Sequence, residues 1–220
     1  LVDASFGDAQ PLPFSLSVAD AATTTTLNTA LWAVKQNRDA SNEQIVFEYK
    51  TEAGLSAVKE FNLNPGTYTV RLKSTVTQNG QAVPATILWG PGLGDSDSQT
   101  TRSAVKPEAL FSSGSSVSRL AASKIATTPS YDQTFDYAGV DDHYFTAIAL
   151  KPGRAKVTYE PLTVPPPANS KDPARDRMAF SVLPATPDQE ITFYAGPKDF
   201  ATLSAIDPSL TSAINFGMFR

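Results

Sequence analysis

The sequence predicts an all-β protein, a large antiparallel β sandwich that ends in short helices. From residue 31 onward, apolar and polar residues alternate over many short segments, and a period of two is typical of half-buried strands. Seventeen prolines are spread along the chain, and prolines favour strand ends and loops over long helices. The helical period of three to four residues is confined to residues 197–214.

The composition is that of a globular domain. The 220 residues suffice for one large β domain or two small ones, and such a chain buries roughly 70% of its unfolded surface on folding. Hydrophobic residues make up 41% of the chain and charged residues 18%, below the roughly 25% of an average protein.

Charge and cysteine usage exclude several function classes. The net charge is −4 and no Lys/Arg run alternates with aromatic residues, so we expect no nucleic-acid partner. The absence of cysteine excludes disulfides and thiolate metal sites. No stretch approaches the roughly 18 consecutive apolar residues of a membrane span. Because initiator Met and signal peptide are both lacking, we expect a piece of a longer protein.

The first part of the chain predicts few regular elements. Residues up to about 29 are expected to be extended or irregular, with an edge strand at Phe14–Val18. Leu31–Val34 and Ile45–Tyr49 are predicted strands, and Asn37–Asn42 between them has the composition of a turn.

The next segment predicts a hairpin and a returning strand. Ala57–Leu63 alternates, residues 64–66 (Asn-Pro-Gly) turn the chain, and a second strand follows. The Asn79-Gly80 pair then predicts another turn, after which Ala82–Trp89 returns as a third antiparallel strand. One face of the second strand carries Tyr68, Val70, Leu72 and Val76.

After Trp89 the strands become harder to delimit. The stretch "WGPGLGD" (Trp89–Asp95) is expected to end its strand and lead into a Ser/Thr-rich loop to Thr101. "KPGR" (Lys151–Arg154) predicts a turn between two strands, and the proline-rich stretch Thr163–Arg177 predicts a surface loop. The further predicted strands are Val117–Ile125, Tyr144–Leu150, Ala155–Glu160, Met178–Leu183 and Glu190–Tyr194.

Two short helices are predicted at the end. Pro197 suits the first position of one helix, and Asp207-Pro208 is a typical start of the other, with Asp as the cap and Pro at the first position. Their apolar residues are Phe200, Leu203 and Ile206 in the first helix, and Leu210, Ala213 and Ile214 in the second.

Candidate catalytic and ligand-binding groups have weak signals. "GPGLG" (Gly90–Gly94) lacks the spacing and the Lys of a phosphate loop, so a tight turn is expected. "DDH" (Asp141–His143) holds the single histidine and is expected to be a structural turn or strand-end cluster. Spacing alone neither predicts nor rules out a pair of catalytic carboxylates. Trp32 and Trp89 are expected to pack in the core rather than stack on a sugar.

Two segments carry a family resemblance. "YAGVDDHYFTAIAL" (Tyr137–Leu150) and "FYAGPKDFATLSAIDPSLTSAINFGMF" (Phe193–Phe219) resemble the large periplasmic domain of the bacterial membrane protein insertase YidC. The first matches an aromatic-small-Gly pattern followed by polar residues and Tyr-Phe, and the second an aromatic-x-Gly-Pro-Lys strand end followed by a helix. The hairpin Phe61–Val83 is also similar to the central strands of that family.

The resemblance implies fold, location and function. It implies a galactose-mutarotase-like β-supersandwich at residues 1–195, followed within the same domain by a helical segment, residues 196–220, that leads to the membrane. It implies a non-catalytic module, without nucleotide or metal cofactor, at the periplasmic face of the bacterial inner membrane. The implied partners are the Sec translocon with its accessory subunits, nascent membrane proteins, and the membrane itself through the rest of the parent chain.

The resemblance also assigns the terminal residues. Aromatic and Met side chains at the end of the helical segment are expected at the bilayer surface, where amphipathic rings are favoured; the alternative is that they pack back on the sandwich edge. The expected membrane-proximal or interaction residues are Phe200, Leu203, Ile206, Leu210, Ile214, Phe216, Met218 and Phe219.

Two other functions stay open at this point. A carbohydrate-binding or mutarotase-like sandwich would need a general acid and base that converge on a sugar ring, and a single His makes that set hard to assemble. An exposed strand edge could instead accept an extended peptide.

Overall fold

The structure is a computed structural model that describes residues 11–38, 43–64, 66–94, 105–114, 116–166, 171 and 174–214. The strands are β1 (Ser15–Ser17), β2 (Ala33–Arg38), β3 (Glu43–Lys50), β4 (Leu55–Asn64), β5 (Thr69–Gln78), β6 (Gln81–Ala82), β7 (Thr86–Leu93), β8 (Glu108–Ser113), β9 (Ser116–Leu120), β10 (Ser130–Asp141), β11 (Phe145–Val164), β12 (Arg175–Pro184) and β13 (Ile191–Pro197). The helices are α1 (Ala21–Thr29), α2 (Ala122–Ile125), α3 (Phe200–Ile206) and the 3₁₀-helix η3 (Pro208–Ala213).

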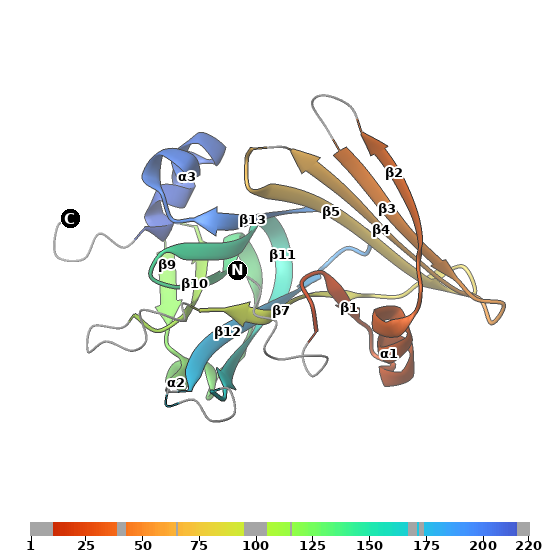
Figure 1. The fold of residues 1–220 in the computed structure, drawn as a ribbon, viewed down its shortest axis with the longest axis horizontal. Coiled ribbons are helices and arrows are strands. Elements are labelled where there is room, and N and C mark those ends of the chain that lie inside the picture. Colours follow the sequence, from red (N-terminus) through yellow and green to blue (C-terminus); the bar gives the residue numbers. More distant parts are fainter. Residues whose placement is uncertain are drawn as a thin grey trace.

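The described strands form one large antiparallel sheet that curls strongly on itself (Figure 1). Its main path runs β1-β7-β12-β11-β13-β5-β4-β3-β2, with β10, β8 and β9 extending from β11 and β6 from β5. The prediction of a mostly β protein with an antiparallel sheet and short C-terminal helices is confirmed.

The N-terminal region contains a helix that the sequence pattern did not indicate. β1 pairs with β7, which confirms the edge strand expected at Phe14–Val18, but the irregular structure predicted up to residue 29 is wrong because α1 forms there. Asp20 caps α1 by accepting a hydrogen bond from the Thr23 N–H at 2.7 Å. Threonine has a low helix propensity and Leu27 is the one buried residue of α1, so no apolar stripe marked it.

β2 to β5 form an antiparallel arm at one end of the sheet (Figure 1). The predicted strand at Ile45–Tyr49 and the hairpin after it are confirmed, with Ile45 opposite Phe61 in the β3/β4 ladder and Phe61 opposite Leu72 in the β4/β5 ladder. β2 runs on to Arg38, so the first two residues of the turn expected at Asn37–Asn42 belong to a strand, and the other four lie outside the described residues.

The returning strand after the Asn79-Gly80 turn is much shorter than predicted. The turn itself is present, with both residues at positive φ, but only the two residues of β6 pair with β5. Pro84 has no N–H to continue that ladder, and the chain crosses to pair with β1 and β12 as β7.

β7 does not end at Trp89. Trp89 lies opposite Phe180 and Leu93 lies opposite Met178, with a register shift between them. The glycine-rich stretch is therefore a bulge inside a strand, and the predicted strand end and tight turn are wrong.

Neither β8 nor β10 was predicted. Most of β8 and the second half of β10 are buried on both faces and lack the alternation of a half-buried strand, whereas the first half of β10 includes the exposed residues Asp132 and Thr134. β10 pairs with β11 on one side and with β8 on the other. The strand predicted at Val117–Ile125 stops at Leu120. α2 begins at Ala122 and buries Ile125, so the second half of that prediction is wrong.

β11 is a single strand of 20 residues rather than two strands joined by a turn at Lys151–Arg154. Lys151 and Gly153 have positive φ, and the pairing with β10 shifts register at this place, so the stretch is a bulge that bends the strand. The part before the bend pairs with β13 and the part after it with β12. Strand structure extends to Val164 and resumes at Arg175, which shortens the loop predicted at Thr163–Arg177.

The two C-terminal helices are present, but the first starts later than predicted. Pro197 still lies opposite Phe145 in the β11/β13 ladder, so it ends a strand and does not begin a helix. Asp199 caps α3 by accepting from the Thr202 N–H at 2.8 Å. Asp207 caps η3 through the Ser209 N–H, with Pro208 at the first position as predicted.

The buried apolar side chains form two clusters on opposite faces of β13. The larger cluster lies inside the curl of the sheet and includes Trp89, Val157 and Phe193. The smaller one lies beneath α3 and η3 and consists of Leu110, Tyr137, Ile148, Tyr194, Leu203, Leu210 and Ala213.

Candidate functional site

The two segments that carry the sequence resemblance lie side by side in the fold. β11 and β13 pair antiparallel, so that Phe145 lies opposite Pro197 and Thr146 opposite Gly196. Close packing explains the glycines at 139 and 196. A Cβ at Gly139 would lie 2.1 Å from the backbone carbonyl oxygen of Ala147, and one at Gly196 would lie 2.8 Å from the side-chain hydroxyl of Tyr194. The site is built where these segments meet the C-terminal helices.

Asp141, the last residue of β10, is the centre of an ion network. Its side chain is 3% exposed, and its Oδ2 accepts a hydrogen bond from Lys198 Nζ at 2.9 Å and another from the Arg119 guanidinium. Arg119 also donates to the backbone carbonyl of Ala213 at the end of η3. One carboxylate therefore connects β9, β10, the end of β13 and the terminal helix.

A second carboxylate completes the charge balance. Glu108 lies directly opposite Asp141 in the β8/β10 ladder. Burial raises the pKa of Glu108, and the negative charge of Asp141 raises it further, while Arg119 and Lys198 lower it. Two acidic and two basic side chains thus share a partly desolvated region. Opposite charges attract each other much more strongly there than at the protein surface.

The residues of the "DDH" stretch have different structural roles. Asp142 is 2% exposed, and its Oδ1 accepts from the N–H groups of Tyr144 at 2.9 Å and Phe145 at 2.8 Å, which closes the turn into β11. His143 is exposed, with its ring edge-on to Tyr144. The prediction of a structural strand-end cluster is confirmed. In the part of the chain that the structure describes, no three His, Cys, Asp or Glu side chains gather as metal ligands would.

The expected interaction residues of the helical segment divide into buried and surface positions. Leu203 and Leu210 are buried in the smaller cluster, Ile206 and Ile214 pack partly against it, and Phe200 is 55% exposed. Phe216, Met218 and Phe219 lie outside the described residues. Apolar packing and the Arg119 bond to Ala213 together hold α3 and η3 on the sheet.

Two tyrosines reinforce this packing with hydrogen bonds. The Tyr137 hydroxyl lies 2.9 Å from Ser212 Oγ, and the Tyr194 hydroxyl donates to the Pro197 carbonyl at 2.6 Å. Burial raises the pKa of Tyr137 and raises that of Tyr194 to about 12, so both hydroxyls stay protonated at neutral pH.

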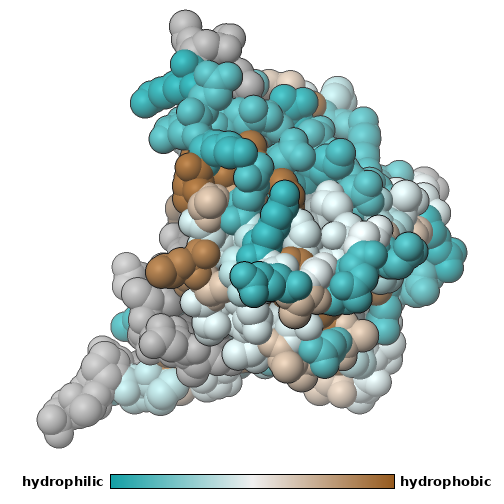
Figure 2. All heavy atoms as spheres, turned by 90° about the vertical axis from the view of Figure 1, so that its right-hand side faces the viewer, coloured by the Kyte–Doolittle hydropathy of each residue, from teal (hydrophilic) through white to brown (hydrophobic). Residues whose placement is uncertain are grey.

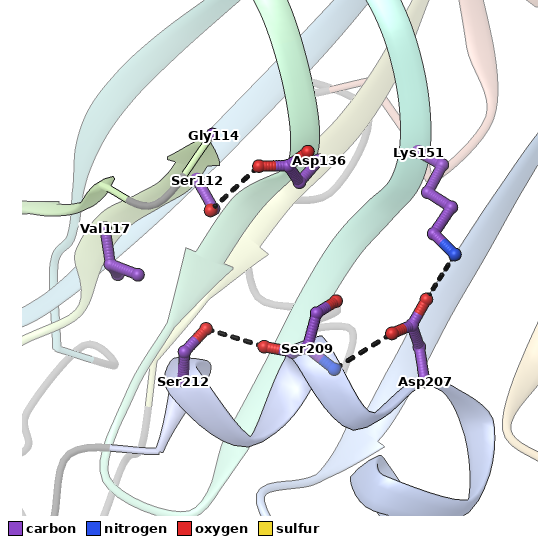
Figure 3. Close-up of a pocket in the computed structure, with 8 residues that line it drawn as sticks. All are labelled: Ser112, Gly114, Val117, Asp136, Lys151, Asp207, Ser209 and Ser212. Carbon is purple, nitrogen blue, oxygen red and sulfur yellow. Dashed lines mark hydrogen bonds and ion pairs between the residues drawn. The ribbon is translucent and has the colours of Figure 1, made fainter.

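An open cleft of about 440 Å³ lies beside η3 (Figure 3). Lys151 and Asp207 form an ion pair at 2.5 Å on one side of it, and Ser112 Oγ donates to Asp136 at 3.2 Å on another. Its lining consists of Ser112, Gly114, Val117, Asp136, Lys151, Asp207, Ser209 and Ser212. These groups can form hydrogen bonds with a polar ligand, but among the described residues that line the cleft there is no aromatic ring for sugar stacking.

Both tryptophans have packing roles, as predicted. Trp89 is 8% exposed and stacks between Phe180 and Phe193. Trp32 packs against the larger cluster, donates its indole N–H to the Leu27 carbonyl, and lies under the ammonium of Lys59, 4.9 Å from the ring centroid.

Comparison with known proteins supplies the family. A family model described as "YidC periplasmic domain" matches residues 1–220, the whole chain. The chain belongs to the YidC periplasmic domain family. A curated relative, "Membrane protein insertase YidC" of Endomicrobium trichonymphae, is 27% identical over 198 residues, which cover 81% of this chain. These residues are 34% of the relative, so the chain spans about a third of its length.

The family resemblance predicted from the sequence is therefore confirmed. In the described residues of this YidC periplasmic domain, none of the helices has both the length and the apolar character that crossing a membrane requires.

Sequence reasoning missed the main polar contacts of the site. Arg119 was assigned to a strand without a role. It is the single charged residue of the segment "SVSRL", which could have indicated a cation that points into the fold. Lys198 was recognised as part of a motif, but its bond to Asp141 joins residues 57 positions apart, which local spacing does not predict.

Proposed function

We propose that this chain is a non-catalytic periplasmic module of a membrane protein insertase and chaperone. In this proposal it supports the insertion and folding of inner-membrane proteins, with or without the Sec translocon. Membership of the YidC periplasmic domain family supports it, as does the relative named as a membrane protein insertase. The observation that carries the mechanism is the attachment of the C-terminal helices to the sheet through Arg119, Asp141 and Lys198.

In this proposal the helical segment holds the sheet in position relative to the membrane. Residues 196–220 lead to the membrane at the periplasmic face of the inner membrane, and the ion network fixes their first part relative to the sheet. Leu203 and Leu210 act as internal anchors, since they are buried. Phe200, which is 55% exposed, and the partly covered Ile206 and Ile214 can contact neighbouring protein or lipid headgroups. Phe216, Met218 and Phe219 are proposed as the membrane-proximal end.

We also infer the finer fold type. The strongly curled antiparallel sheet, with its main core inside the curl, supports the galactose-mutarotase-like supersandwich for residues 1–195. Catalysis is not part of this proposal because the buried carboxylates of Asp141 and Asp142 are engaged in an ion network and a turn. The proposed partners are translocon subunits, nascent membrane proteins and the membrane, and not nucleic acid.

Complementation by the full-length parent gene tests the function. In cells depleted of their own insertase, deletion of Ala201–Phe219 should abolish growth, whereas deletion within the Thr163–Arg177 loop should be tolerated. Because the first deletion removes Leu203 and Leu210 and so threatens the fold, Lys198→Met provides a second variant. Asp141 keeps Arg119 as its partner there, so the domain should fold while client insertion, followed by protease protection, decreases. Equal complementation by both deletions, or full insertion with Lys198→Met, would contradict the proposal.

A further inference from the structure

β2 is an open edge of the sheet. It is the last strand of the main path and pairs with β3 alone among the described strands (Figure 1). All six of its residues are exposed. In an antiparallel ladder, alternate residues of an edge strand direct their N–H and C=O groups outward, where a further strand can bind them. The backbone chemistry of this edge therefore fits an extended polypeptide.

The same edge offers apolar contacts on one face. Val34 lies opposite Phe47, and Ile45 lies two residues further along the same face of β3. Val34 is 56% exposed, and Leu31, shortly before the strand, is 96% exposed. Figure 2 looks onto the side of the molecule where the arm lies and shows apolar patches among polar side chains. An added strand would cover this face with every second side chain.

Charge argues against a second copy of β2 as the occupant. β2 carries Lys35 and Arg38 and no acidic residue, so antiparallel pairing with itself would bring four cations onto one ladder. Lys35 already forms an ion pair with Glu48 of β3 at 2.9 Å, which shows that this strand pairs well with an acidic neighbour. A segment with apolar and acidic residues is therefore the better match.

We propose that the outer edge of β2 binds an extended segment of another polypeptide by strand addition. An apolar side chain of that segment lies beside Val34 and a carboxylate lies near Arg38. The inference rests on the proposed function only for the source of the segment, an unfolded stretch of a client protein. The binding itself is a property of the sheet edge.

A peptide that copies β3 provides a probe with the required pattern. The sequence EQIVFEYK (Glu43–Lys50) already pairs with β2 from the inner side in a known register. A fluorescein-labelled, end-blocked copy should bind the 220-residue chain saturably in fluorescence anisotropy. The same peptide with Pro in place of both its Ile and the Val that follows should not bind, because one of two neighbouring residues directs its N–H into the new ladder and proline removes that N–H.

Matched substitutions in the chain locate the binding edge. Val34→Pro and Lys35→Pro are made in parallel, because one of two neighbouring residues directs its N–H outward and can become proline without breaking the β2/β3 ladder. The variant that keeps the circular dichroism and unfolding midpoint of the wild type should lose peptide binding. Arg38→Glu should weaken binding about tenfold by charge repulsion. Ser116→Pro, at the start of β9, which pairs with β8 alone among the described strands, should leave binding unchanged.

Two results would overturn the inference. One is unchanged binding by the folded proline variant. The other is a dimer of the unliganded chain, in light scattering, that the same variant dissociates, since the occupant would then be a second copy. Peptide binding and complementation by Lys198→Met are separate measurements, so failure of the edge does not count against the proposed insertase role.

Discussion

Asp141 and Lys198, separated by 57 positions in the sequence, form an ion pair at 2.9 Å in a region where their side chains are only 3% and 12% exposed. The pair joins the end of β10 to the end of β13, and Arg119 extends it to the terminal helix. A buried charge group of this kind is costly to break, because the remaining charges lose their compensation. The attachment of the helical segment therefore depends on Asp141.

Asp141→Asn should destabilise the domain strongly. It leaves Arg119 and Lys198 facing each other without their shared carboxylate, and loss of one partner from a buried ion pair typically costs about 3–5 kcal/mol. Urea unfolding at pH 7 measures the change. Asp132→Asn is the matched control: its partner Arg154 and Asp132 itself are more than 60% exposed, so the expected cost is about 0–1 kcal/mol. Equal costs for both variants would contradict the role of Asp141.

Leu203→Ala and Phe200→Ala should differ in their effect on the free energy of unfolding, because one of these residues of α3 is buried and the other is exposed. Leu203 is the buried residue of α3, and truncation of a buried Leu costs about 2–5 kcal/mol. Phe200 is 55% exposed, so its truncation should change the free energy of unfolding by only about 0.5 kcal/mol. Thermal unfolding measures both. A large loss for Phe200→Ala would show that this ring stabilises the domain rather than serving a partner.

The sequence predicted elements whose signals are local. Alternation and the Asn-Pro-Gly sequence at residues 64–66 predicted the β4–β5 hairpin, Asn79-Gly80 predicted the turn after β5, and Asp207-Pro208 predicted η3. α1 was missed because its threonines carry no apolar stripe. Its hydroxyls instead bond to carbonyls four residues back, as Thr25 does to Ala21 at 3.1 Å. β8 and the second half of β10 were missed because strand segments buried on both faces do not alternate.

The bends of the sheet and the polar contacts of the site depend on long-range pairing. Glycine and proline in "KPGR" signal a turn locally, yet here they form a bulge, since both sides of it hydrogen-bond to continuous neighbouring strands. The motif segments were recognisable as patterns, but the contact between Asp141 and Lys198 follows from the β10/β11 register together with the β11/β13 register. Local periodicity does not determine these registers.

Asp207→Asn should lower the free energy of unfolding only at pH values at which Asp207 of the wild type is ionised. The hydrogen bond from Lys151, with smaller contributions from Ser209, lowers the pKa of Asp207 to about 2 in the folded state. A lowered pKa contributes stability above the unfolded value near 4, and this contribution is lost as the pH falls towards 2. Asn keeps the helix cap, so the wild type should exceed the variant by at most about 1 kcal/mol at pH 6. A difference that persists at pH 2 would contradict this origin.

Lys59 should make the stability of the domain rise in alkaline solution. Burial lowers the pKa of Lys59 from its ordinary value of 10.5 to about 8, and the ammonium donates a hydrogen bond to the Phe14 carbonyl at 3.0 Å. A lysine with a lowered folded pKa binds its proton more weakly in the folded than in the unfolded state. The desolvation penalty is therefore complete below pH 8 and disappears between pH 8 and 10.5. Lys59→Met removes the titrating group, so urea midpoints of wild type and variant at pH 7 and pH 10 isolate its contribution. The wild type should gain stability relative to Lys59→Met over this interval, and a constant difference would mean that Lys59 keeps an ordinary pKa in the fold.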